Sequence, residues 1–168
     1  EMGENFAKLL EESAKVEGDF WIKYISPHPK DFTDELIKVI ADNPKIARML
    51  HLPLQAGSTK ILDAMNRGYT KEEFIALAQK IKKAIPDIGL TTDIIVGFPG
   101  ETAEDYEELY KFVEKTKFDK MGAFSYSKEE NTPAEKLKEQ IHPATKKSRY
   151  NKIMQLQQKV VEQNIIKH

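Results

Sequence analysis

The 168 residues are 40% hydrophobic and 32% charged, and the formal charge of −1 gives no general sign of nucleic-acid or membrane binding. The chain contains no cysteine, which excludes disulfides, a thiol nucleophile and thiolate metal ligands. No apolar run approaches the roughly 20 residues of a membrane span, and without a signal-peptide pattern we expect a soluble cytoplasmic protein of one domain or part of one.

Helical segments and short apolar runs alternate along the first half of the chain. Residues 5–16 carry apolar side chains at helical spacing, and the aromatic, β-branched run 20–26 predicts a strand. The predictions that follow are a helix over 31–41, a strand over 49–55 whose far end is disturbed by Pro53, and a short helix from Ser58 to Met65.

The second half continues the alternation. Thr70 and Glu73 form a capping box that begins the next helix, and Thr132 with Glu135 repeats the pattern. The strongest strand is predicted over 89–98, followed by a helix over 102–115, a strand over 121–127 and a long amphipathic helix from Pro143. The apolar stripe of that last helix is Tyr150, Ile153, Met154, Val160, Val161 and Ile165, interrupted by Gln157.

This order predicts an α/β fold of βα units with a parallel sheet of four strands. It fits an open doubly wound sheet or part of a (β/α) barrel, and in both the ligands bind at the carboxyl ends of the strands. The places to search are therefore 26–29, 55–58, 97–102 and 125–128.

Polar groups at these strand ends suit a ligand with several functional groups. Asp93 and Gln55 can accept and donate hydrogen bonds to a ribose diol. Gly97 and Gly100 let the main chain approach a flat ring. Together these groups suggest a nucleoside-like ligand.

Simpler interpretations remain for each residue. The glycines can serve only a tight strand-to-helix turn, and Gln55 can cap the following helix. His28 and His51 are expected to be packing or surface residues, because no metal-binding spacing surrounds them. The basic run 146–152 is typical of a solvated helix face. Asp93 would be costly to bury unpaired, so it needs a partner or a polar cavity.

Several motifs resemble one family closely. In order they are SPHPKDFTDELI, HLPLQAGS, ILDAMNRGYT, TTDIIVGFPGET and FSYSKEENTPA. From about Phe20 to Tyr150 the chain resembles the radical S-adenosylmethionine methylthiotransferases, which insert a methylthio group into an unactivated C–H bond. The first three motifs favour the branch that acts on isopentenyl-adenosine next to the tRNA anticodon, and the last also resembles the branch that modifies an aspartate of a ribosomal protein. Asn131 stands where the family usually has glycine.

The resemblance implies roles for individual residues. Gln55 and Asp93 hold the ribose hydroxyls, Ile95 packs on adenine, and Arg67 pairs with the methionyl carboxylate. The full expected set of cofactor-binding residues is Gln55, Ser58, Arg67, Asp93, Ile95, Gly97, Phe124 and Tyr126, with Ser26 and His28 towards the substrate and no catalytic residue in the chain.

The resemblance also implies cofactors that this chain cannot hold alone. The family binds four-iron four-sulfur clusters through cysteines. One of these clusters reduces S-adenosylmethionine, which then yields a deoxyadenosyl radical. Because cysteine is absent, we expect the chain to be the C-terminal half of the radical domain, half of a partial TIM-like barrel, and to be inactive alone. Residues 1–142 form that half, and 143–168 form a helix leading towards an RNA-binding domain.

The expected partner of the intact protein is tRNA, and open sheet edges suggest self-association. An alternative is a non-enzymatic fragment that binds RNA through Lys146, Lys147, Arg149, Lys152 and Lys159. A barrel hydrolase or aldolase is disfavoured, since only Asp93 is well placed for such chemistry.

Overall fold

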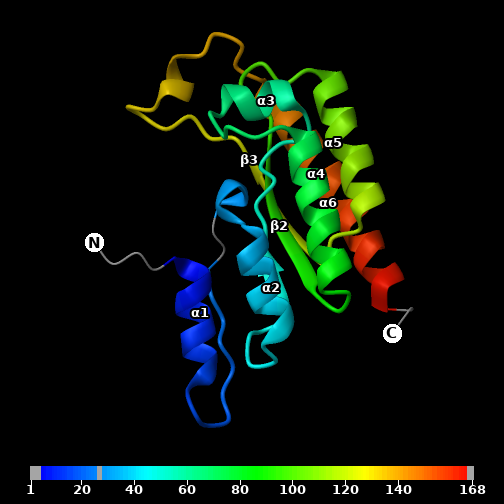
Figure 1. Ribbon diagram of the computed structural model, residues 1–168. Helices are drawn as coiled ribbons and strands as arrows, with labels where there is room; N and C mark the ends of the chain where they lie inside the picture. Colours follow the sequence, from blue (N-terminus) through cyan, green and yellow to red (C-terminus); the bar gives the residue numbers. More distant parts are fainter. Residues whose placement is uncertain (1–4, 26–27, 166–168) are drawn as a thin grey trace.

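The computed structural model describes residues 5–25 and 28–165, and it contains a parallel sheet with the strand order β1-β2-β3. The strands are β1 (Met49–His51), β2 (Gly89–Val96) and β3 (Lys120–Ser125). Helix α4 (Lys71–Ala84) connects β1 to β2 and α5 (Ala103–Thr116) connects β2 to β3, while α6 (Pro143–Ile165) follows β3 (Figure 1). The predicted α/β fold with a parallel sheet and a long final helix is confirmed.

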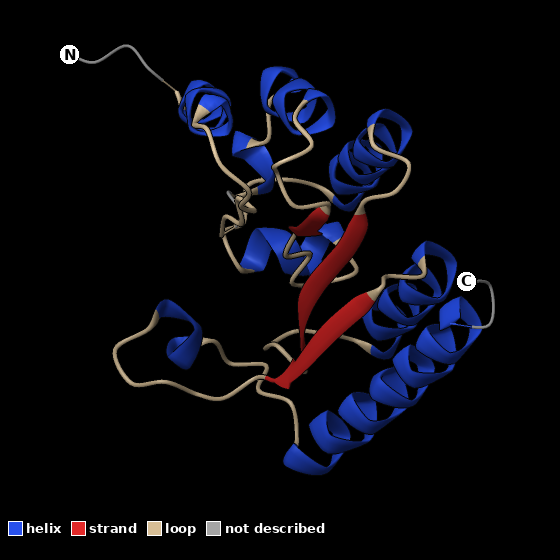
Figure 2. Ribbon diagram, turned by 90° about the horizontal axis from the view of Figure 1, so that it is seen from below, coloured by secondary structure: helices blue, strands red, loops and turns tan. Residues whose placement is uncertain are grey.

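The remaining elements are short or lie at the N-terminal side. Helix α1 (Phe6–Lys15) packs against α2 (Asp34–Asp42), and α3 (Thr59–Ala64) follows β1. Two 3-10 helices are η1 (Pro29–Asp31) and η2 (Pro133–Lys136). Figure 2 shows α4, α5 and α6 on one side of the sheet, with the loop that carries η2 extending from the end of β3.

The prediction of a strand over 20–26 is wrong. Within 20–25 the chain makes a single parallel bridge, between Ile22 and Ile46. Trp21 and Ile25 are 73% and 97% exposed, so neither is buried against the sheet or a helix. A β-branched run becomes a strand when a neighbouring strand pairs with it along its length, and within 20–25 only Ile22 forms a bridge, although Tyr24 also packs on Phe6 of α1.

The predicted strand over 49–55 is interrupted rather than continuous. Regular pairing ends at His51, and the chain rejoins β2 at a bridge between Gln55 and Ile94. Leu52 N–H donates to Thr91 O and Gln55 N–H to Asp93 O, so three residues on one strand span two on its neighbour. This is a one-residue bulge, and it contains Pro53, which cannot donate to the ladder.

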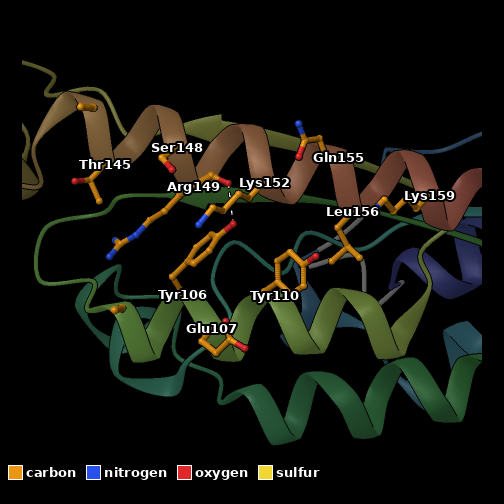
Figure 3. Close-up of a pocket in the computed structure, with 12 residues that line it drawn as sticks. Tyr106, Glu107, Tyr110, Thr145, Ser148, Arg149, Lys152, Gln155, Leu156 and Lys159 are labelled. Atoms are coloured by element: carbon orange, nitrogen blue, oxygen red, sulfur yellow. Dashed lines mark hydrogen bonds between the residues drawn. The ribbon is translucent and has the colours of Figure 1, made fainter.

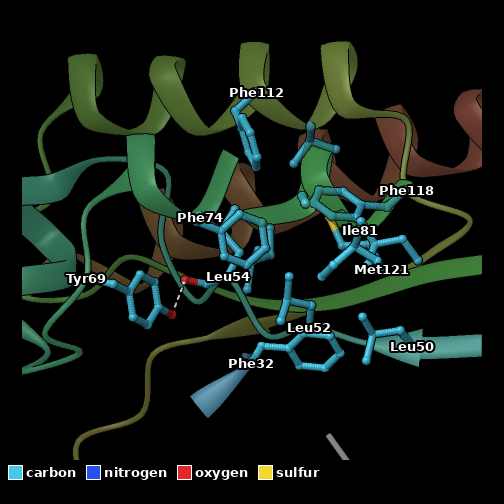
Figure 4. Close-up of a cluster of buried hydrophobic side chains, with 14 of the residues drawn as sticks. Phe32, Leu50, Leu52, Leu54, Tyr69, Phe74, Ile81, Phe112, Phe118 and Met121 are labelled. Carbon is cyan, nitrogen blue, oxygen red and sulfur yellow. Dashed lines mark hydrogen bonds between the residues drawn. The ribbon is translucent and has the colours of Figure 1, made fainter. Parts of the chain in front are cut away.

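The core lies between the sheet and its helices. Phe74 of α4 and Phe112 of α5 meet edge to face with ring centroids 6.1 Å apart, and Phe112 meets Phe118 in the same way at 5.9 Å. Figure 4 shows these rings with Ile81 and Met121 over the buried side of the strands. The aromatic side chains of α4 and α5 therefore form one apolar layer with the strands.

The two faces of the sheet differ sharply in burial. Along β2, Leu90, Thr92, Ile94 and Val96 are buried on the helix side, and the alternating residues Thr91, Asp93 and Ile95 are only half-buried. Because β2 and β3 pair in register, with Asp93 opposite Gly122 and Ile95 opposite Phe124, the same division extends across the sheet. The half-buried and exposed side, called the open face below, carries His51, Thr91, Asp93, Ile95, Gly122 and Phe124.

Helix α6 differs from the predicted stripe. Ile153 and Val160 are buried as expected, but Leu156 and Gln157 are buried with them. Gln157, predicted to interrupt the stripe, belongs to it, because its Nε2 donates to Phe118 O at 3.1 Å. Met154 and Val161 are only half-buried, and the side chain of Ile165 lies outside the described part.

Local signals at helix starts are confirmed more closely. Thr70 and Glu73 form the predicted capping box of α4. Ser58 caps α3, and Thr132 caps η2 with Pro133 at its first position. Asn131 has φ 65°, a conformation that favours glycine and that asparagine tolerates.

Candidate functional site

Asp93 projects from β2 onto the open face and has a partner there. Its Oδ2 lies 3.5 Å from His51 Nε2, and the side chains of both residues are about 40% exposed. The other ring nitrogen of His51, Nδ1, lies 2.9 Å from Thr91 Oγ1. Asp93 is thus neither buried nor unpaired, and part of its carboxylate remains accessible to a ligand.

Gln55 lies beside Asp93 through the main chain. Gln55 N–H donates to Asp93 O at 2.9 Å, and Ile95 N–H donates to Gln55 O at 2.8 Å. Gln55 has φ 71°, in the left-handed region, as expected at a bulge. Its half-buried side chain makes no hydrogen bond within residues 5–25 and 28–165. The alternative that Gln55 caps α3 is wrong, because Ser58 Oγ, itself buried, accepts the Ile61 N–H.

Apolar groups lie next to these polar ones, towards the carboxyl ends of the strands. Ile95 and Phe124 are register partners, and Phe124 is 56% exposed. An exposed aromatic side chain beside an aliphatic one offers a surface on which a flat ring can stack.

Arg67 and His28 both contact Tyr69, which lies close to the bulge. The Tyr69 hydroxyl lies 3.0 Å from Pro53 O and 3.1 Å from Leu54 O, so it fixes the chain that leads to Gln55. Burial raises the pKa of Tyr69, and the nearby Arg67 guanidinium opposes that shift. Arg67 Nε is buried and has no hydrogen-bond partner in the described part of the chain.

His28 packs edge to face on Tyr69, with ring centroids 5.3 Å apart, and its Nδ1 accepts the Lys30 N–H at the start of η1. This agrees with the expected packing role. Ser26, the other residue expected to face the substrate, lies outside the described residues.

The turn after β2 is closed by the chain itself. Gly97 and Gly100 have φ 74° and 82°, which confirms that a tight turn needs them. A Cβ on Gly97 would lie 2.5 Å from Lys146 Cγ, and Gly100 N–H donates to Glu139 O. The space beside Gly97, where a side chain would be, is therefore occupied by Lys146 of α6. The space beside Gly100 is bordered by Glu139 of the loop before α6.

Glu101 was not singled out from the sequence, yet it organises this turn. Its Oε1 accepts the Gly97 N–H at 2.9 Å and pairs with Arg149 Nη1 of α6 at 2.5 Å. The two side chains are 3% and 11% exposed. Burial raises the pKa of Glu101, while the Gly97 N–H and Arg149 oppose the shift. The signal that could have found Glu101 was its position directly after the glycine turn.

The basic run at the start of α6 is only partly a solvated face. Arg149 pairs with Glu101, and Lys146 Nζ donates to Tyr126 O at 2.9 Å and lies over the Tyr126 ring. Tyr126 in turn packs on Phe98 with ring centroids 5.2 Å apart. The prediction of a fully solvated basic face is therefore wrong for Lys146 and Arg149, which join α6 to the strand ends.

A groove of about 750 Å³ runs between α5 and α6 (Figure 3). Tyr106 and Tyr110 of α5 face Leu156 of α6 across it, with Lys152 and Lys159 on the α6 side. The Tyr106 hydroxyl donates to Arg149 O at 2.8 Å, and burial raises the pKa of Tyr106 to about 12. The groove lies among the helices and contains no residue of the open face.

Within the described ranges, no group of three or more His, Asp or Glu side chains could hold a metal ion. The same ranges include no helix with the length and apolar character needed to cross a membrane.

Comparison with known proteins places this arrangement in a family. The family model for the radical SAM superfamily matches residues 1–113, about two thirds of the chain. The chain therefore belongs to the radical SAM superfamily. The solved structure of coproporphyrinogen III oxidase (HemN) from Escherichia coli, described as a radical SAM enzyme, shares the fold with a TM-score of 0.65 at 18% identity, covering 79% of this chain and 31% of that one. The predicted partial barrel is thereby confirmed.

Curated relatives within the superfamily are methylthiotransferases. The chain is 53% identical over 157 residues to tRNA-2-methylthio-N(6)-dimethylallyladenosine synthase of Fusobacterium nucleatum, covering 94% of this chain. It is 51% identical over 158 residues to ribosomal protein uS12 methylthiotransferase RimO of Alkaliphilus oremlandii, again over 94% of this chain. The chain spans 36% of the length of each relative.

Proposed function

We propose that this chain is part of a radical S-adenosylmethionine methylthiotransferase that modifies a tRNA adenosine, and that its strand ends position S-adenosylmethionine. Residues 1–142 form part of the radical domain, and the helix that begins at residue 143 leads towards an RNA-binding domain. The observation that carries the proposal is the open face of the sheet. There a carboxylate, an amide in the adjoining bulge and an apolar pair lie at the carboxyl ends of parallel strands.

The residues present fit S-adenosylmethionine. Asp93 and Gln55 would hold the ribose diol, because both carry polar atoms that internal contacts leave free or partly exposed. Ile95 and Phe124 would contact the adenine ring. The buried and unpartnered Nε of Arg67 fits a carboxylate ligand such as the methionyl group. The assignments of Ser58, Gly97, Tyr126, Ser26 and His28 remain predictions.

When bound, S-adenosylmethionine would supply the reactive deoxyadenosyl group. This chain's own residues contribute binding and orientation, which hold that group at a fixed place relative to the substrate. The residues do not fit an iron–sulfur cluster, since no cysteine is present. We therefore expect no methylthiolation by the chain alone, and detectable product from it after cluster reconstitution would contradict this assignment.

A calorimetric titration with S-adenosylmethionine tests the cofactor site. Asp93→Asn should weaken binding by at least about tenfold, because hydrogen bonds to a charged group contribute roughly 1.5–3 kcal/mol each. Asp87→Asn is the matched control, since Asp87 is an exposed carboxylate just before β2, at the other end of the strand. Equal affinity of Asp93→Asn and the parent chain would refute the site.

Exchange of segments tests the substrate. The segment of the Fusobacterium nucleatum tRNA enzyme that matches 157 residues of this chain is replaced by those residues, and methylthiolated tRNA is measured by mass spectrometry. The same exchange into the Alkaliphilus oremlandii ribosomal-protein enzyme is assayed on uS12. Activity restored in the tRNA enzyme supports the proposal. Activity restored only in the uS12 enzyme would favour the ribosomal branch instead, to which the chain is 51% identical.

A non-enzymatic RNA-binding role has less support. Of the five basic residues expected to form its patch, Lys146 and Arg149 are engaged by Tyr126 and Glu101. Binding to an anticodon stem-loop through the remaining lysines would weaken steeply with salt, whereas nucleoside binding should change little between 50 and 200 mM salt.

Size-exclusion chromatography measures the predicted self-association through strand edges.

A further inference from the structure

Gly122 of β3 is unusual in this sheet because of what occupies the space where its side chain would be. A Cβ on Gly122 would lie 2.4 Å from Asp93 Oδ1 and 3.4 Å from Asp93 Cγ. The carboxylate thus extends sideways from β2 across the neighbouring strand, over the one position of β3 that has no side chain. Asp93 and Gly122 are register partners, which places them side by side on the open face.

His51 contacts the same carboxylate from the opposite strand. Its Nε2 lies 3.5 Å from Asp93 Oδ2, and Thr91 Oγ1 holds the other ring nitrogen at 2.9 Å. Oδ1 therefore lies over Gly122 while Oδ2 faces His51, so the two oxygens of one carboxylate are set by β3 and β1 respectively.

We infer that Gly122 and His51 are positioning residues that together fix the orientation of the Asp93 carboxylate. Gly122 leaves the space into which the carboxylate turns, and His51 holds it there. The inference rests on the proposed function only in naming the ligand as a nucleoside, since the geometry exists without it. Neither residue was expected to contribute to binding from the sequence.

The substitution Gly122→Ala separates positioning from folding. The atom that a new methyl group would meet is the end of a flexible side chain, so the carboxylate can swing away while the strand stays in place. Gly89→Ala is the matched control on the same sheet. A Cβ on Gly89 would meet only Arg48 O at 3.6 Å, which is an ordinary contact.

The first measurement is calorimetric binding of S-adenosylmethionine, with a thermal melt of each variant. We expect Gly122→Ala to weaken binding by at least about tenfold, because a ribose diol needs both carboxylate oxygens in place. Its melting temperature should stay within a few degrees of the parent, and Gly89→Ala should bind like the parent. His51→Phe should also weaken binding, and His51→Gln, which keeps an N–H donor, should restore part of it. Unchanged binding by Gly122→Ala, or an equal loss in Gly89→Ala, would overturn the inference.

The second measurement needs no ligand. The side-chain carboxyl ¹³C signal of Asp93 and the ring ¹⁵N signals of His51 should shift in Gly122→Ala and stay in place in Gly89→Ala. If the parent chain binds no S-adenosylmethionine, the cofactor assignment fails, and these signals alone decide the positioning role. Signals that do not respond to Gly122→Ala would refute it.

Discussion

The buried pair of Glu101 and Arg149 gives the sharpest test of how α6 is joined to the sheet. We consider Arg149→Met, which keeps most of the side-chain length and removes the charge. The substitution leaves the Glu101 side chain, now 3% exposed, with the Gly97 N–H as its one remaining hydrogen-bond partner among the described residues. Breaking a buried ion pair from one side costs about 3–5 kcal/mol, because the remaining charge is left desolvated.

Urea denaturation measures this loss, and a double-mutant cycle isolates the pair. Arg149→Met with Glu101→Gln should lose clearly less than the sum of the two single changes, because no unpaired charge remains. Lys152→Met on the exposed side of α6 is the control and should change stability by no more than about 0.5 kcal/mol.

The pH dependence gives an independent check. Burial already raises the pKa of Glu101 above its usual 4.5, and removal of Arg149 raises it further. An acid whose pKa is raised on folding binds more protons in the folded state, so stability falls as pH rises through the interval between the unfolded and folded pKa. Arg149→Met should therefore lose less stability near pH 5 than near pH 7.5. An equal loss at both values, or additive single changes, would refute the reasoning.

Three further changes test the packing and the caps. Phe74→Ala should destabilise the chain by about 3–5 kcal/mol, since this ring is 1% exposed, and Leu9→Ala, at a position 60% exposed, should have little effect in the same urea assay. Gly57→Ala should destabilise the chain by about 1–3 kcal/mol or more, because a Cβ there would lie 2.2 Å from Leu109 Cα, a main-chain atom that cannot rotate away. Wild-type stability of this variant would contradict the close approach of α5 to Gly57. Thr70→Ala should cost about 1 kcal/mol and reduce helicity measured by circular dichroism, whereas an unchanged value would mean that the capping box contributes nothing.

Local sequence signals predicted the helices well, because interactions between residues close in the sequence determine where a helix begins. The capping box of Thr70 and Glu73 located the start of α4, and the helix predicted over 102–115 matches α5 within one residue at each end. The strand predicted over 20–26 was wrong because its composition suits a strand, whereas a strand also needs a paired neighbour along its length; within the described residues 20–25 only Ile22 forms a bridge.

The candidate site was predicted in part for the same reason. The strand-end rule drew attention to Asp93 and Gln55, which the structure places side by side through the main chain. Glu101, His51 and Gly122 were missed because their roles depend on partners 48, 42 and 29 residues away along the chain, at Arg149, Asp93 and Asp93 respectively. Spacing along one segment cannot reveal such pairs.

The surplus residue between Leu52 and Gln55 has a consequence for the phase of the sheet. Up to Leu52 the two strands run in step, and from Gln55 onward they are offset by one position relative to that earlier register. Side chains of a strand alternate between the two faces of the sheet with a period of two. A shift of one residue therefore places the side chains after the bulge on the opposite face from the one that the earlier register would give them. Removal of one residue within 53–54 would restore the original phase and place the Gln55 amide on a different side of its own strand, even though Gln55, His51 and Asp93 would all still be present.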